Sequence, residues 1–360
     1  NLSRNFSRNG LRLALFNRKV DGLEEGIAEK KKQLYPELNN AEAFEDLKGF
    51  ILALETPRKI LIMLPSGKPT ENFFDQLLPL IKKGDIIIDG ANSHYQQTNK
   101  WAKILERKKI LFLGIGISGG KEGALNGASL MVGGNKNAYE LIKNDLFQIS
   151  AKNRKKKPCC CYFGYGGAGH YVKMIHNGIE YAEMQLISEV YALCRSNFLH
   201  KEIQHALNKW NKTESRSYLL EITASLLMYQ KNQIPFIEMI EDQASNNGSG
   251  AWATSEGIEL GYPNNMMATA LYSRYISSFK ADRVKFARNF SKKRAINKLS
   301  LNQLKKSYDL SRWVNHHQGF EMLALAANHY KWKIDLDEVA EVWSDGCIIK
   351  SELMNFCNSF

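Results

Sequence analysis

The pattern of strands and helices changes once along the chain, and that change constrains the fold more than any other feature. Up to Gly164, short apolar runs such as residues 59–64 and 85–89 alternate with amphipathic stretches. Such runs are typical of strands buried on both faces, and their alternation with helices predicts a parallel, doubly wound sheet. Beyond Gly164 only helical periodicity remains. We therefore expect an α/β domain at residues 1–165 and an all-helical domain at residues 166–360.

Within the first domain the expected strands are residues 11–16, 59–64, 85–89, 110–115, 129–132 and 160–163. The expected helices are residues 1–9, 70–82, 97–108 and 138–149, with a charged helical stretch from the first strand to about Glu55. Pro79 is expected to kink or end the helix over residues 70–82. The first long helix of the second domain is expected to begin near Ala168.

Composition narrows the class of protein. The 360 residues are 44% hydrophobic and 24% charged, which is ordinary for a globular protein. No apolar run approaches the roughly 18 residues of a membrane span, and the N-terminus lacks the core of a signal peptide. The six cysteines show no metal-ligand spacing, which favours a reducing cytoplasm and no metal site. The net charge of +12 comes without an aromatic-basic motif, so we expect no nucleic-acid partner.

A glycine-rich turn at residue 164 opens into a helix with one polar face. That face carries Lys173, His176, Asn177, Glu180 and Tyr181, at i, i+3, i+4, i+7 and i+8. An ammonium, an imidazole, an amide and a carboxylate on one stripe suit acid–base chemistry on a small polar substrate. An ordinary amphipathic surface helix is the alternative, and the stripe alone does not decide between them.

Two loops point to the same region. Residues 114–119 fit G-x-G-x-x-G, but several strands precede them, so they are a weak dinucleotide fingerprint. Ser118, Gly119 and Gly120 instead allow main-chain N–H groups to approach an anion. Asn92 follows the strand at residues 85–89, at the carboxyl edge where ligands bind in such sheets. Together with the polar helix face, these loops predict one cleft between the two domains.

Arg18 follows the strand at residues 11–16. An arginine at this point of a dinucleotide-binding fold suits the 2′-phosphate of NADP, whereas an acidic residue would suit the ribose of NAD. On this interpretation the glycine fingerprint would precede residue 1. The alternative is that Asn17 and Arg18 form a polar turn.

Several longer segments identify a family. GDIIIDGANSHY, GIGISGGKEGALNGASLMVGGN, GAGHYVKMIHNGIEYAEMQLI, WNKTE and DGCIIKS together resemble the decarboxylating 6-phosphogluconate dehydrogenases, from residue 1 to about residue 355. HNGIEY is the most specific of these motifs. The broader β-hydroxyacid dehydrogenase group shares the Ser-Gly-Gly loop and the Lys/Asn pair but not this extension.

The resemblance implies a Rossmann-like coenzyme domain followed by an all-α domain, in a cytoplasmic homodimer. It implies oxidative decarboxylation of 6-phospho-D-gluconate to D-ribulose 5-phosphate and CO₂, with NADP as cofactor and no metal. Lys173 would be the general base at the C3 hydroxyl, and Glu180 the acid that protonates C1 of the enediol. Implied substrate contacts are Asn92, Ser118, Gly119, Gly120, His176, Asn177, Tyr181, Asn247 and Arg274. Implied cofactor contacts are Asn17, Arg18, Lys19, Leu64 and Asn92.

The chain also departs from the family pattern. We expect the family's first strand, glycine fingerprint and C-terminal tail to lie outside it. Where the family reads K-G-T-G-x-W, this chain has Asn247 in place of a phosphate-binding lysine, and a neutral amide is a poorer phosphate partner. Lys121, Ala91 and Pro65 replace a usual Glu, Gly and Lys. Two alternatives therefore stay open: a related β-hydroxyacid dehydrogenase, and an inactive dimerising relic of the family.

Overall fold

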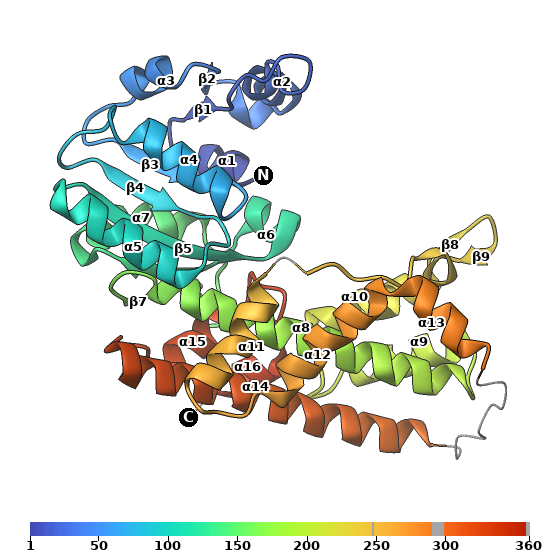
Figure 1. Cartoon of the computed structure of the whole chain (residues 1–360). Coiled ribbons are helices and arrows are strands. Elements are labelled where there is room, and N and C mark those ends of the chain that lie inside the picture. Colours follow the sequence, from blue (N-terminus) through green and yellow to red (C-terminus); the bar gives the residue numbers. More distant parts are fainter. Residues whose placement is uncertain (247, 290–298, 358–360) are drawn as a thin grey trace. The chain divides into compact units, whose positions relative to one another are not determined.

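A computed structural model describes residues 1–246, 248–289 and 299–357 (Figure 1). Its contacts divide the chain into two compact units. The first unit is Asn1–Lys173 with Trp332–Cys347, and the second is Met174–Lys331 with Ile348–Phe360. The division falls inside one helix, α8 (Ala168–Arg195), so this helix contributes side chains to both units. The segment at 332–347 lies late in the sequence and nevertheless packs within the first unit.

The first unit is built on a five-stranded sheet in the order β3-β4-β5-β6-β7. The strands are β3 (Lys59–Ile62), β4 (Ile86–Asp89), β5 (Leu111–Ser118), β6 (Ser129–Gly134) and β7 (Cys160–Gly164). β3, β4 and β5 are parallel, as are β6 and β7, but β6 runs antiparallel to β5. The prediction of an entirely parallel sheet is therefore wrong at this pair. Only the short helix α6 (Gly120–Asn126) joins β5 to β6, whereas a parallel crossover needs about a dozen residues or more.

Two further strands lie outside the main sheet. β1 (Ala14–Phe16) and β2 (Glu42–Phe44) form a separate parallel pair. The prediction of a continuous helical stretch to Glu55 is wrong because β2 interrupts it. The stretch also contains α2 (Ile27–Leu34), the 3₁₀ turn η1 (Pro36–Leu38) and α3 (Leu47–Ala53). A strand as short as β2 leaves too few residues for a period of two to be recognised.

Helices cover both faces of the main sheet, as the continuous apolar strands indicated. Ile86 and Ile88 of β4 pack in one core with α7 (Lys136–Ile149), and Ile87 faces a second core. The second core includes residues of α4 (Lys68–Leu77) and α5 (Tyr95–Arg107). α4 ends two residues before Pro79, in agreement with the expected break. α1 (Leu2–Arg8) and α15 (Leu336–Trp343) complete the unit.

The second unit is helical. Besides its part of α8 it contains α9 (His200–Trp210), α10 (Tyr218–Met228), α11 (Ser249–Glu259), α12 (Asn265–Ser278), α13 (Lys280–Ala287), α14 (Leu301–Tyr330) and α16 (Glu352–Cys357). Its described strands are a short hairpin, β8 (Gln230–Lys231) and β9 (Ile234–Pro235), followed by η2 (Phe236–Met239). An α/β domain followed by a helical one, with the long helix starting at Ala168, is confirmed.

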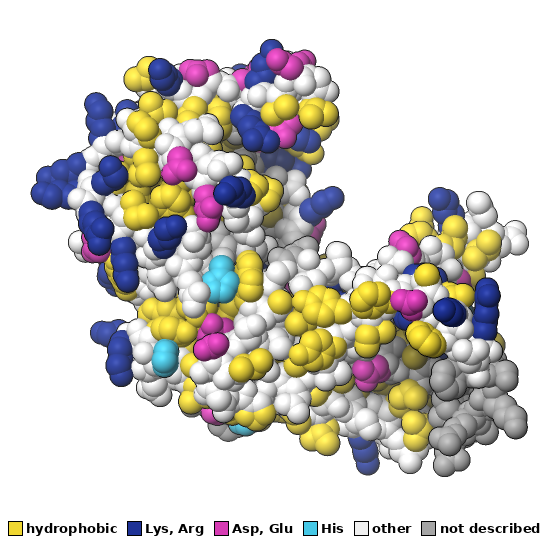
Figure 2. Space-filling model, in the orientation of Figure 1, with side chains coloured by type: hydrophobic (Ala, Val, Ile, Leu, Met, Phe, Trp, Pro, Cys, Tyr) yellow, Lys and Arg dark blue, Asp and Glu magenta, His cyan; other side chains and the backbone are white. Residues whose placement is uncertain are grey.

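The surface of the second unit is rich in apolar side chains (Figure 2). For example, Ile276 on α12 is 57% exposed, and Phe279 directly after this helix is 58% exposed. Within the described ranges, no helix combines the length and the hydropathy that crossing a bilayer requires.

A buried ion pair fixes the start of β3 in the first unit. The Arg58 guanidinium lies 3.1 Å from Asp85, and the Asp85 carboxylate also accepts the main-chain N–H groups of Arg58 and Lys82, each at 2.8 Å. Arg58 Nε donates to the carbonyl of Ile51 in α3 at 2.9 Å. Both side chains are almost fully buried, so each charge depends on the other for compensation.

We therefore predict that Asp85→Ala lowers the free energy of unfolding by about 3–5 kcal/mol, since it leaves a buried guanidinium and two main-chain donors unpaired. Urea unfolding measures this change. The matched control is Glu55→Ala, which removes the partner of Arg12 from a fully solvated pair and should stay within about 0.5 kcal/mol of the parent. Equal effects of the two substitutions would contradict the argument from burial.

Candidate active site

Lys173 lies where α8 crosses the main sheet. Its side chain is buried, with 7% exposure. The helix approaches β5 closely because Gly116 has no side chain: a Cβ there would lie 2.2 Å from Lys173 Cβ and 3.0 Å from the carbonyl of Gly169. The second glycine of the G-x-G-x-x-G match therefore makes room for the candidate base.

The Ser-Gly-Gly loop follows directly at the end of β5. Ser118 is buried, and Gly119 and Gly120 have φ values of 114° and 60° at the start of α6. A Cβ on Gly119 would lie 2.4 Å from the carbonyl oxygen of Gly346, which also accepts the N–H of Ser129 at 3.0 Å. Only glycine fits this position, and Gly346 supports the loop from behind. Gly346 is not among the predicted site residues, although it lies in the DGC motif that contributed to the resemblance.

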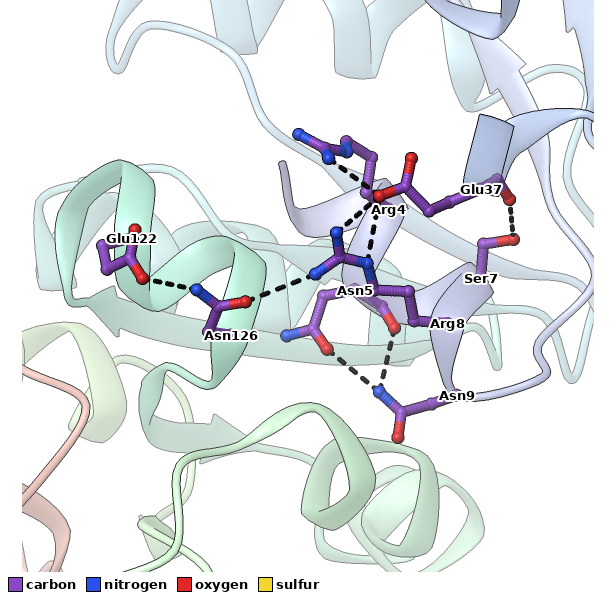
Figure 3. Close-up of polar contacts among 8 residues, drawn as sticks. All are labelled: Arg4, Asn5, Ser7, Arg8, Asn9, Glu37, Glu122 and Asn126. Atoms are coloured by element: carbon purple, nitrogen blue, oxygen red, sulfur yellow. Dashed lines mark hydrogen bonds and ion pairs between the residues drawn. The ribbon is translucent and has the colours of Figure 1, made fainter. Parts of the chain in front are cut away.

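A polar network anchors α6 to the N-terminal helix (Figure 3). Arg8 donates to the side-chain oxygen of Asn126 at 3.3 Å, and Asn126 in turn donates to Glu122. Arg4 and Arg8 both contact one carboxylate oxygen of Glu37, at 2.8 and 2.5 Å. These hydrogen bonds, led by that of Arg4, lower the pKa of Glu37 to about 2. The helix behind the Ser-Gly-Gly loop is thus tied to α1 and η1 by charges that persist at neutral pH.

Asn92 lies in the loop after β4, and its side chain is exposed. The loop is shaped by Asp89, whose buried carboxylate accepts the N–H of Ala91 at 3.0 Å. Asn92, Ser118 and Lys173 therefore all belong to the first unit, and each follows or contacts a strand of the main sheet. These three residues are thus the part of the predicted site that lies within the first unit.

The next polar residues of α8 belong to the second unit. Nδ1 of His176 lies 3.6 Å from Oε2 of Glu180 and 3.2 Å from the side-chain oxygen of Asn177. Asn177 donates to the hydroxyl of Ser249 at 3.0 Å. His176 is fully buried, whereas the Glu180 side chain is 20% exposed. A partly exposed carboxyl group beside a buried imidazole can exchange a proton with a bound ligand.

In the second unit, a cationic side chain and hydroxyl groups lie next to these residues. The Arg274 guanidinium stacks on the ring of Tyr181, 3.7 Å from its centroid, and donates to the carbonyl of Ser245 at 2.8 Å. Gly250 at the start of α11 packs on Tyr181, since a Cβ there would lie 2.6 Å from the ring. A helix N-terminus, a guanidinium and hydroxyl groups are suited to bind a phosphate dianion.

Sequence reasoning missed Ser249, the first residue of α11. Its position after Gly248, which has a φ of 92°, was the available signal, because a Gly-Ser-Gly turn before a helical period marks a helix start. Asn247, the predicted substitution of a phosphate-binding lysine, lies outside the described residues.

The candidate cofactor residues lie at the end of β1. Asn17 donates to Glu24 at 3.1 Å, Arg18 is 3.8 Å from the same carboxylate, and Lys19 pairs with Asp21 at 2.9 Å. The Arg18 side chain is 72% exposed, so its guanidinium can exchange this long contact for a phosphate. Leu64, half-buried, follows β3. The residues present fit a phosphorylated dinucleotide. Across the described ranges, no group of His, Cys, Asp and Glu is arranged to hold a metal ion.

Comparisons with known proteins match both parts of the chain. A model of the NAD binding domain of 6-phosphogluconate dehydrogenase matches residues 1–166, and one of the C-terminal domain matches residues 169–360. Decarboxylating 6-phosphogluconate dehydrogenases of Raoultella planticola and Staphylococcus aureus are each 38% identical over 98% of this chain, and the match covers 80% and 76% of those proteins.

Comparison with solved structures also finds a 6-phosphogluconate dehydrogenase. The 6-phosphogluconate dehydrogenase of Plasmodium falciparum, described in apo form and with its cofactor NADP⁺ and its substrate 6-phosphogluconate, superposes with a TM-score of 0.92. It is 34% identical, over 99% of this chain and 78% of its own. A 3-hydroxyisobutyrate dehydrogenase of Salmonella typhimurium, 15% identical over 78% of this chain and 90% of its own, shares the fold with a TM-score of 0.58. The chain belongs to the 6-phosphogluconate dehydrogenase family.

Proposed function

We propose that this chain oxidatively decarboxylates 6-phospho-D-gluconate to D-ribulose 5-phosphate and CO₂ with NADP, and that α8 supplies both proton-transfer groups. The observation that carries the proposal is the position of Lys173 and Glu180 on one helix. They are two turns, or about 10 Å, apart along its axis, and their side chains can serve two carbons of one extended sugar acid. The division of the chain into two domains at residues 165/166 belongs to the same proposal.

Lys173 is proposed as the base that takes the proton of the C3 hydroxyl. A lysine does this only as the neutral amine, and burial disfavours the charged form of an amine. When bound, NADP accepts the hydride from C3. The C1–C2 bond of the resulting 3-keto acid then breaks, CO₂ leaves, and the electron pair moves toward the C3 oxygen. The Lys173 ammonium returns its proton to that oxygen, which gives the enediol.

Glu180 is proposed as the acid that delivers a proton to the enediol carbon that becomes C1 of the product. His176 lies on one side of it, and the exposed part of the carboxyl group can take a proton back from solvent. Asn92, Ser118, Gly119, Gly120 and Asn177 are proposed to hold the carboxylate and hydroxyl groups of the substrate.

The phosphate of the substrate is proposed to bind at the start of α11. Arg274 supplies a fixed positive charge on the ring of Tyr181, and Ser249 supplies a hydroxyl at the helix N-terminus. Asn247 would contribute a neutral amide there. For the cofactor, Arg18 and its neighbours Asn17 and Lys19 are proposed to hold the 2′-phosphate of NADP, with Leu64 and Asn92 as further contacts.

A reducing compartment is proposed as the location, in the cytoplasm. All six cysteines are free thiols, even though Cys159, Cys160 and Cys161 are consecutive. Burial raises the pKa of Cys159 to about 12, so this thiol is protonated and unreactive at neutral pH. Proteins rich in unpaired cysteine are typical of reducing environments.

We propose further that the chain forms a homodimer through its second unit. Supporting this, α12 exposes Tyr272, Tyr275 and Ile276, each 41–57% accessible, at i, i+3 and i+4, and Phe279 directly after the helix is 58% exposed. An apolar stripe of this kind on a helix is typical of a protein–protein interface.

The two roles on α8 predict different kinetic defects. Lys173→Met should abolish hydride transfer, so rapid mixing with both substrates should give no burst of NADPH absorbance. Glu180→Ala should leave the burst and slow steady-state turnover, because only the later proton transfer is lost. Glu189→Ala, an exposed carboxylate on the same helix, is the control and should behave like the parent. A burst from Lys173→Met would overturn the assignment of the base.

The proposed contact of Arg274 with the substrate phosphate predicts a defect in substrate binding. Arg274→Met should raise KM for 6-phosphogluconate by about tenfold to a hundredfold, the value of one charge-assisted hydrogen bond, and leave KM for NADP unchanged. Arg283→Met is the matched control, because it removes an arginine of α13 that pairs with Asp242. An unchanged KM in Arg274→Met would mean that another group binds the phosphate or that the substrate lacks one.

The dimer predicts a mass of twice 41.0 kDa in light scattering. Ile276→Glu places a charge in the proposed interface and should shift the mass toward that of the single chain. Leu23→Glu, at an 81% exposed position of the first unit, should not. A parent protein that is monomeric at micromolar concentration would refute the proposal.

A further inference from the structure

A buried histidine occupies the first turn of α8, one turn before Lys173. His170 is 2% exposed, and its Nδ1 lies 2.7 Å from the hydroxyl of Thr98 in α5. Nε2 is also buried, with no hydrogen-bond partner among the described residues. The mechanism above gives this side chain no role. A fully buried imidazole with one short hydrogen bond is costly unless its position serves a purpose.

The surroundings of the ring connect two parts of the candidate site. The main chain of Asp89, Ala91 and Ile115 faces the imidazole. Asp89 and Ala91 form the turn that carries Asn92, and Ile115 belongs to β5. His170 is three residues before Lys173, so the two side chains lie on the same face of α8. The ring therefore lies between the Asn92 loop and the helix that holds the candidate base.

The packing around the ring leaves it little freedom. A Cβ on Gly114 would lie 2.5 Å from a methyl group of Thr98 and 3.0 Å from His170 Nδ1. The start of α8 is held to α5 by a second contact, in which Asn99 accepts the N–H of Gly167 at 2.8 Å. The imidazole can thus neither rotate away nor shift without displacing α5 or β5.

The ring is neutral. Burial lowers the pKa of His170 below its usual range, although the nearby Asp89 carboxylate acts in the opposite direction. The tautomer of the ring sets the direction of the hydrogen bond between Nδ1 and the hydroxyl of Thr98, and this hydroxyl also reaches the carbonyl of His94, just after the Asn92 turn, at 3.3 Å. The neutral ring thus contacts α5 through Nδ1 and lies beside the main chain of the Asn92 turn.

We propose that His170 and Thr98 are a positioning pair that fixes the Asn92 loop relative to Lys173. The pair acts through main chain and packing, without touching the substrate. This inference rests on the proposed function for its kinetic consequence only. The physical tie between the loop at residues 89–92 and the first turns of α8 is a property of the fold.

The test removes the hydroxyl and keeps the shape. Thr98→Val replaces the hydroxyl by a methyl group of similar size and removes the hydrogen bond to Nδ1, whereas Thr98→Ser keeps this hydrogen bond. Amide hydrogen exchange is followed at residues 90–93 and 168–173 in the full chain. We expect Thr98→Val to lose protection in both segments together, and Thr98→Ser to retain it. This readout needs no turnover, so a chain without activity would count against the proposed function alone.

Kinetics supply the second readout. With active sites counted by NADP binding, Thr98→Val should lower kcat by about tenfold to a hundredfold, the range expected for a small misplacement of reacting groups. The Kd for NADP should be unchanged, and Thr98→Ser should recover most of kcat. His170→Asn, which retains an acceptor near the position of Nδ1, should be milder than His170→Leu.

A merely structural role would appear differently. It would lower the melting temperature and the count of active sites, with kcat per site unchanged. Unaltered exchange at both segments in Thr98→Val would overturn the inference, whether or not the histidine variants fold. Unaltered kcat per site with altered exchange would restrict the pair to a role in the fold and would equally reject positioning.

Discussion

The first unit depends on a contact between backbones that only glycine permits. α8 lies against β5 and β6 so closely that a Cβ on Gly116, Gly133 or Gly169 would come within 2.2–2.4 Å of a neighbouring atom. Main chain therefore packs on main chain where the helix starts. The cost is the conformational entropy of three glycines, and the gain is a helix whose position over the sheet has little freedom. Lys173 is buried at this contact, so its position over the sheet has equally little freedom.

Beyond this contact, α8 carries the other candidate residues for proton transfer and substrate binding. One continuous element presents Lys173 in the first unit and His176, Asn177, Glu180 and Tyr181 in the second. Rigid helical geometry sets the spacing of the candidate base and acid without any need for a flexible loop to hold either. Within the second unit, Ser249 at the start of α11 contacts Asn177 of this helix, and Arg274 of α12 stacks on Tyr181.

Sequence reasoning found the large features for physical reasons. The strands of the main sheet read as continuous apolar runs because they are buried on both faces, and the period of α8 is long enough to be unambiguous. The reversal of β6 depends on connection length and pairing, which composition does not show. β2 is too short to carry a period. The position of the G-x-G-x-x-G match, after several strands, made it a weak dinucleotide fingerprint, but the packing of α8 on Gly116 appears only when the neighbour of this glycine is known. The turn at Gly248 marks the start of a helix at Ser249, but the contacts of Ser249 with Asn177 and of Gly346 with Gly119 join residues distant in sequence, which no local pattern shows.

The most direct test of the account follows the proton that Glu180 is proposed to deliver. The purified chain is given 6-phosphogluconate and NADP in D₂O, and NADPH, CO₂ and the labelling of the product are measured together. Two protein groups at fixed positions on one helix predict equal amounts of NADPH and CO₂, and ribulose 5-phosphate with one deuterium at C1 in a single configuration. NADPH without CO₂, or deuterium in both configurations at C1, would contradict the claim that α8 supplies the acid as well as the base.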